Sequence, residues 1–135
     1  MKFIYGLFFI PLMACQSGQR ENQLPSNAYR DLLIDRVVWE KGDSKNVKDT
    51  ATNLHTFTLT NTSDAYAYRQ IEVRFNYFDS TYHKIGSSQK ILDKTIGPRA
   101  ALIVGKIQDG KVQAGAKSST VTIVNAVAER AEPEK

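Results

Sequence analysis

The chain offers few side chains that could perform acid–base or nucleophilic chemistry. Its 135 residues include two histidines, His55 and His83, and a single cysteine, Cys15. The histidines fall on different predicted elements, and neither has a neighbour at a spacing typical of metal ligands. The sequence contains no Gly-x-Ser-x-Gly elbow, no Cys–His pair and no glycine-rich phosphate loop. We therefore predict no catalytic residues, no metal site and no cofactor.

Cys15 is the one residue with a distinct predicted chemistry. It follows a short cationic start at Lys2 and an apolar run over residues 3–13, as in a secretory signal peptide. That run is shorter than the about 20 residues needed to cross a bilayer. The segment Leu12-Met13-Ala14-Cys15 resembles the lipobox of bacterial lipoproteins, in which the cysteine becomes acylated. The resemblance implies lipid such as palmitate on Cys15, a membrane partner and a location in the bacterial cell envelope, at the periplasmic face or the cell surface.

Composition and charge limit the other possibilities. A lone cysteine excludes a disulfide within the chain, and the alternative to acylation is an ordinary secreted protein with a free thiol. The net charge of +4 comes from 18 basic and 14 acidic residues of mixed order, so we predict no nucleic-acid partner. We divide the chain into a signal peptide (1–14), an acylated cysteine with a flexible tether (15–29), a β-sandwich domain (30–129) and a charged tail (130–135).

The element expected to organise the domain is a strand over residues 66–79. Its inward residues are apolar and its outward residues are polar, which is the period of two of a half-buried strand. The apolar set is Ile71, Val73, Phe75 and Tyr77, and the polar set is Gln70, Glu72, Arg74 and Asn76. A second strand over residues 52–61 places His55, Phe57 and Leu59 on one face and a row of threonines on the other. His55 is therefore expected in the core or at its rim.

The remaining strands are indicated by β-branched runs between turn signals. We expect them within residues 31–40, after a short helical turn that includes Leu32, Leu33 and Asp35, and at residues 82–92, 100–108 and 118–128. Turns are expected at residues 61–64, 79–81, 96–99 and 109–110. The pattern predicts an all-β fold, an immunoglobulin-like antiparallel β-sandwich of six or seven strands.

A family resemblance agrees with this fold. The segment Phe75-Asn76-Tyr77-Phe78-Asp79 resembles the name-giving motif of the FxLYD domain family, with Phe75 and Asp79 at its ends. Residues 59–63 resemble a strand of that family that ends in Asn and a small polar residue, and residues 96–98 resemble its later Pro/Gly turn. The resemblance implies an immunoglobulin-like sandwich on an exported protein, and it carries over no catalytic residues.

A possible contact surface is suggested by tyrosines and charges near the ends of the 66–79 strand, because tyrosine is enriched at protein contacts. Its members are Tyr66, Tyr68, Tyr82, His83 and Lys84. We expect a non-catalytic interaction module that contacts an envelope protein or polymer. The alternative is a small-ligand carrier with a pocket between the two sheets, and a hydrolase is a third possibility.

Overall fold

The computed structural model describes residues 24–42 and 51–132. These residues form one short helix and six strands. They are α1 (Ala28–Asp31), β1 (Leu32–Lys41), β2 (Thr52–Asn61), β3 (Tyr66–Phe78), β4 (Lys84–Leu92), β5 (Ala101–Lys111) and β6 (Ser118–Arg130). Cys15, the predicted signal peptide and most of the predicted tether lie outside the described residues.

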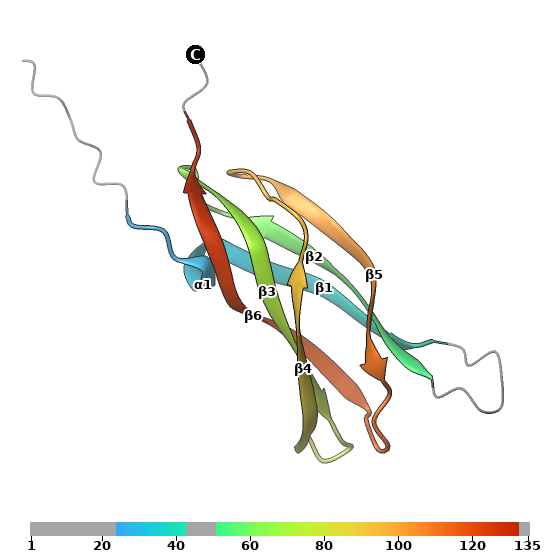
Figure 1. The fold of residues 1–135 in the computed structure, drawn as a ribbon. Coiled ribbons are helices and arrows are strands. Elements are labelled where there is room, and N and C mark those ends of the chain that lie inside the picture. The colour runs from blue at the N-terminus through green and yellow to red at the C-terminus, as the bar shows by residue number, and fades with distance from the viewer. Residues whose placement is uncertain (1–23, 43–50, 133–135) are drawn as a thin grey trace, which may run out of the picture.

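The strands form two packed antiparallel sheets, which Figure 1 shows as two layers. One sheet has the order β1-β2-β5 and the other has the order β4-β3-β6. In immunoglobulin-like sandwiches, strands A, B and E lie in one sheet and strands C′, C and F in the other. Here β1, β2 and β5 have the arrangement of the first set, and β4, β3 and β6 have that of the second. The predicted all-β sandwich is therefore confirmed, with six strands.

The two central strands, β2 and β3, supply most of the core. Along β2, buried and half-buried residues alternate without interruption, so the threonine row faces outward as predicted. On β3, Phe75 and its inward neighbours are fully buried. The buried hydrophobic residues include Leu32, Phe57, Leu59, Tyr68, Ile71, Val73, Phe75, Tyr77, Leu92, Ile96, Val104 and Val121. They come from both sheets, so the core lies between them.

Two bulges change which side chains face the core. Gln70 has a positive φ of 48°, and the β3–β6 register shifts between Arg69 and Glu72. Because the extra residue reverses the alternation, Tyr68 and Ile71 both point inward although their numbers differ in parity. Arg36, with φ 51°, produces the same reversal in β1. The inward positions predicted for Ile71, Val73, Phe75 and Tyr77 are therefore confirmed, and the reversal lies just before them, between Tyr68 and Ile71.

Two local predictions are wrong. The helical turn comes before Leu32, at Ala28–Asp31, because the Asn27 side chain caps it by accepting from the backbone N–H of Arg30. The turn predicted at residues 109–110 is instead part of β5, which continues to Lys111. Gly110 has a φ of 60°, so this glycine accommodates a bulge rather than a chain reversal.

Truncating the centre of β3 should be costly. Phe75 is fully buried and its ring stacks on that of His55, with 4.1 Å between ring centroids. Phe75→Ala is expected to lower the free energy of unfolding by about 3–5 kcal/mol, measured by denaturant titration. The control Ile103→Ala truncates an aliphatic side chain that is 75% exposed and should cost about 0.5 kcal/mol or less. A loss below about 1 kcal/mol for Phe75→Ala would contradict this description of the core.

Candidate functional site

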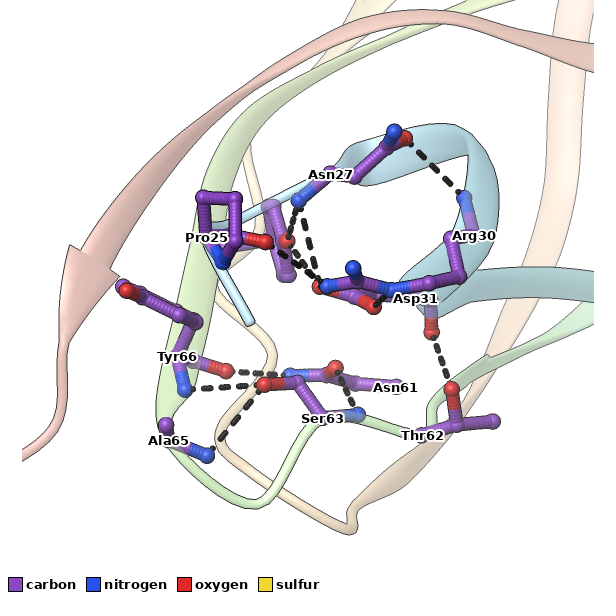
Figure 2. A network of polar contacts seen from close by, with 10 residues as sticks. Pro25, Asn27, Arg30, Asp31, Asn61, Thr62, Ser63, Ala65 and Tyr66 are labelled. Carbon is purple, nitrogen blue, oxygen red and sulfur yellow. Dashed lines mark hydrogen bonds and ion pairs between the residues drawn. The ribbon is translucent and has the colours of Figure 1, made fainter. Parts of the chain in front are cut away.

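A polar cluster fastens α1 to the start of β3 (Figure 2). The carboxylate of Asp31 accepts a hydrogen bond from the Tyr68 hydroxyl at 2.5 Å and from the Asn27 backbone N–H at 3.3 Å. Arg30 donates to the other oxygen of Asp31 at 2.6 Å, and it also donates to the Pro25 carbonyl at 2.8 Å. These contacts hold the chain from Pro25 onward against the sandwich. The last residues of the predicted tether therefore belong to the folded part.

The hydrogen bonds of this cluster determine the protonation states of Asp31 and Tyr68. Burial acts to raise the pKa of Asp31, but hydrogen bonds from Arg30, Tyr68 and the Asn27 backbone outweigh it and hold that pKa below its ordinary value. Burial, together with the hydrogen bond to Asp31, raises the pKa of Tyr68 to about 12. At neutral pH the cluster is thus a carboxylate bonded to a neutral phenol, an arrangement that stabilises the fold.

A second network of hydrogen bonds holds the turn between β2 and β3 (Figure 2). The Asn61 amide donates to the carbonyls of Tyr66 at 2.7 Å and Gly97 at 3.0 Å, and it accepts from the Ser63 backbone N–H. Thr62 donates from its backbone and its hydroxyl to the Asp31 carbonyl. Asn61 is fully buried. Asn61-Thr62-Ser63 therefore builds a turn, which confirms the prediction of turn chemistry at this segment.

Asp31→Asn should destabilise the protein in a pH-dependent way. Because the folded pKa of Asp31 is lowered, its carboxylate contributes stability above the ordinary carboxyl range, and that contribution is lost as the pH falls through the folded pKa. We expect a loss of about 1–3 kcal/mol in the free energy of unfolding at pH 7 and a smaller loss near pH 3. Asp64→Asn, at an exposed carboxylate, is the matched control. A loss that is the same at both pH values would contradict the proposed ionised state.

A second buried aspartate joins the two sheets at their other end. Asp109 of β5 accepts hydrogen bonds from the hydroxyls of Tyr77 on β3 and Ser88 on β4. Burial and this contact raise the pKa of the Tyr77 hydroxyl. The Asn53 amide donates to the Asp109 carbonyl at 3.0 Å and accepts from the indole N–H of Trp39 at 2.9 Å. The role of Asp109 could not be predicted from the sequence, because its partners lie 21 and 32 residues away along the chain.

His55 lies in the core, as expected. Its ring is fully buried against Phe75 and Tyr77, and Nε2 lies 2.9 Å from the Ser119 hydroxyl. Burial lowers the pKa of His55 to about 4, against the opposing influence of Asp109, so the imidazole is neutral at pH 7. A serine beside an imidazole can be a nucleophile when a third group orients the ring. Nδ1 of His55 has no hydrogen-bond partner among the described residues, so we interpret His55 as structural.

The buried histidine predicts a stability profile. Between pH 6.5 and about pH 4 the unfolded chain binds a proton at His55 more readily than the folded chain does. The free energy of unfolding should therefore fall as the pH decreases through this window, by up to about 3 kcal/mol from this residue. His55→Phe keeps a ring against Phe75 and should flatten the profile in chemical denaturation at several pH values. An unchanged slope would show that His55 is already charged in the folded protein.

The predicted contact residues lie in two separate places. Tyr68 is only 1% exposed and Tyr66 is half-buried, and both lie where β3 begins. Tyr82, His83 and Lys84 are exposed beyond the other end of this 13-residue strand, about 40 Å away. The five residues therefore do not form one surface, and Tyr68 is a core residue. The bulge at Gln70, which turns Tyr68 inward, explains the error for that residue.

The turn after β3 presents an exposed tyrosine. The carboxylate of Asp79 accepts from the backbone N–H groups of Thr81 at 2.8 Å and His83 at 3.0 Å. Hydrogen bonds from Thr81 and His83 lower the pKa of Asp79. Asp79 therefore caps the turn that was predicted at residues 79–81. Tyr82 is 82% exposed and has a φ of 62°, a left-handed conformation that is uncommon for a bulky residue.

The four sheet edges differ in how regular they are. β1 is interrupted at Arg36, and β5 has register shifts around Lys106 and Gly110. β6 has a shift at Val124, whose carbonyl accepts a hydrogen bond from the Tyr29 hydroxyl at 2.5 Å. The register of β4 with β3 shifts only at its start and is continuous from Gly86 to Leu92. Among the described strands, β4 is therefore the edge with the longest regular stretch.

Two surface grooves are lined in part by Tyr29 of α1. One of about 420 Å³ lies between α1 and β6 and includes Tyr68 in its wall, and one of about 270 Å³ lies between β1 and β6. Both lie along one side of the sandwich rather than in its core. Within residues 24–42 and 51–132, no cluster of His, Cys, Asp and Glu side chains could hold a metal ion. The same residues contain no helix that is long and apolar enough to span a membrane.

Comparisons with known proteins add no relative. No protein-family model matches the chain, and neither the curated proteins nor the solved structures contain a match. The class defined by the structure is thus a small all-β protein of two three-stranded antiparallel sheets.

Proposed function

We propose that the protein is a lipid-anchored envelope lipoprotein whose β-sandwich is a non-catalytic interaction module. The anchor is the acyl-bearing Cys15 predicted from the sequence, and the FxLYD-like motif supports an exported sandwich. The observation that carries the interaction role is the β4 edge. This edge strand has an almost continuous register and no described strand on its outer side.

The surroundings of β4 support this role. An unpaired edge exposes a row of backbone N–H and C=O groups that can accept a further strand. Ile85 and Ile91 are exposed on this strand and give a partner apolar surface. Tyr82, His83 and Lys84 lead directly into β4, so the exposed part of the predicted contact surface continues into the edge. The region around β4 thus presents exposed backbone donors and acceptors together with the side chains of Ile85, Ile91 and Tyr82.

The anchor geometry is compatible with contacts close to a membrane. Asn27, which is fixed to Tyr68, follows Cys15 by twelve residues. Twelve residues can span at most about 40 Å, whatever path they follow. The sandwich is therefore confined near the membrane, where other anchored proteins are concentrated.

The carrier alternative gains less support. The groove of about 420 Å³ has the volume of a small-ligand site, but it is formed by α1 and β6 outside the sandwich. The carrier hypothesis placed its pocket between the two sheets. The hydrolase hypothesis requires a titratable cluster in a cleft. The His55–Ser119 contact lies in the core instead, where Phe75 and Tyr77 pack against the His55 ring.

Photo-crosslinking in intact cells tests the proposed function. A photoreactive residue replaces Ser87, which is exposed on β4, and in a matched strain it replaces Ile103, which is exposed on the outer face of the other sheet. We expect an adduct of defined mass from position 87 and little from position 103. The adduct should weaken when Cys15→Ala removes the anchor. Equal adducts at both positions, or none at position 87, would contradict an interaction role for β4.

A further inference from the structure

We propose that β4 pairs with β4 of a second copy of this chain, antiparallel and about a two-fold axis at Ser88. This inference rests on the proposed interaction role and names its partner. The pairing joins two three-stranded sheets into one continuous sheet with the order β6-β3-β4-β4-β3-β6. Because each copy uses its β4 edge once, the assembly closes as a dimer.

The amino-acid order of β4 is self-complementary in this register. An axis at Ser88, the midpoint of Lys84–Leu92, places Ile91 of one copy opposite Ile85 of the other, at the register shift where β4 begins, twice in each dimer. Ile91 is 62% exposed and Ile85 is partly exposed, so both isoleucines can be covered on pairing. Cross-strand aliphatic pairs of this kind stabilise antiparallel ladders.

The charges of β4 agree with the same register. Lys84 lies opposite Leu92 of the second copy, and Lys90 lies opposite Gly86, so no like charges face each other directly. Shifting the strands by two residues in one direction places Lys84 opposite Lys90, and like charges at opposite positions destabilise a ladder. Shifting them by two residues in the other direction places Ile85 opposite Asp93. The register centred on Ser88 is thus favoured by both apolar and charged side chains.

The inner face of β4 is already held in place, which leaves its edge and outer face for a partner. The Ser88 hydroxyl donates to Asp109, and the Lys90 ammonium donates to the Gln108 carbonyl at 3.0 Å. Gly86 lies directly under the Gln113 side chain, since a Cβ there would come within 2.0 Å of its amide nitrogen. β4 is therefore bound to the rest of its own sandwich before a partner arrives, so pairing needs little further ordering.

The other edges are less suitable for a second strand. Bulges interrupt β1 and β5, and the Tyr29 hydroxyl bonds to the bulged part of β6. The regular part of β4, Gly86–Leu92, is shorter than the nine-residue strand, and a ladder of this length is smaller than a standard interface of about 800 Å² per partner, so the dimer should be weak in dilute solution. The two copies run in opposite directions. Tethers of up to about 40 Å let both reach one membrane when the strands lie along it, where confinement favours pairing.

Disulfide trapping tests the register. Full-length chains carry Cys15→Ser, so that each engineered thiol is the only one present, with either Ser87→Cys or Gln89→Cys. Residues 87 and 89 face each other in the proposed dimer, so mild oxidation of the mixture should give more linked dimer than either variant alone. Ser87→Cys mixed with Ile103→Cys is the control and should stay monomeric. Equal linkage in all samples, or linkage only with position 103, would overturn the register.

Sedimentation equilibrium of the full-length chain in detergent tests the contact energetically. Ile91→Lys should weaken dimerisation about tenfold or more, whereas Ile103→Lys, at a side chain with similar exposure, should leave it unchanged. Circular dichroism checks that both variants fold. If Ile91→Lys does not fold, the disulfide-trapping experiment tests the β4–β4 contact in its place. A chain that is monomeric at all concentrations overturns the dimer. If the position-87 photo-adduct then contains a different protein, the interaction role stands without self-pairing, and if there is no adduct, both fail.

Discussion

Two buried tyrosine–aspartate hydrogen bonds connect the sheets of this sandwich, and both tyrosines come from β3. Tyr68 bonds to Asp31 at one end of the strand, and Tyr77 bonds to Asp109 at the other. A buried carboxylate is costly unless hydrogen bonds replace its hydration, and each of these aspartates receives at least two. The aspartates belong to the α1–β1 side and to β5, so each bond crosses between layers. Since a hydrogen bond is directional, these contacts fix the alignment of sheets that apolar packing alone leaves less defined.

This alignment depends on one backbone irregularity. The positions of Tyr68 and Tyr77 differ by an odd number, 77 − 68 = 9, so an unbroken strand would place the two side chains on opposite faces. The bulge at Gln70 reverses the alternation and brings both hydroxyls inside. A positive φ at a non-glycine residue raises the free energy of the folded chain. The buried hydrogen bonds at the two ends of β3 offset this increase. The irregularity is thus a structural requirement of the core.

The same irregularities mark the limit of what the sequence could predict. Strands β2, β3 and β6 follow from period-two alternation and β-branched runs, and the sandwich class follows from their number and spacing. The bulges at Arg36 and Gln70 could not be predicted, because both residues also suit an exposed strand position. The partners of Asp109 come together only when the sheets pack, and the following glycine resembles a turn signal. Of the predicted contact residues, Tyr82, His83 and Lys84 follow the turn predicted at residues 79–81 and are exposed, whereas the bulge at Gln70 turns Tyr68 inward.

The bulges and the hydrogen-bonded clusters are unevenly distributed over the edges of the two sheets. The bonded clusters around Asp31 and Asp109 hold the ends of the sandwich, and the bulges in β1, β5 and β6 make those edges poor templates for another strand. β4 has neither protection along most of its length, although Ser88 and Lys90 bind its inner face to β5. An edge that is rigid on one side and regular on the other is already in the conformation that strand addition requires. In the proposed pairing, a partner strand at β4 would add a ladder without rearranging the core, because the hydrogen bonds of Ser88 and Lys90 stay in place.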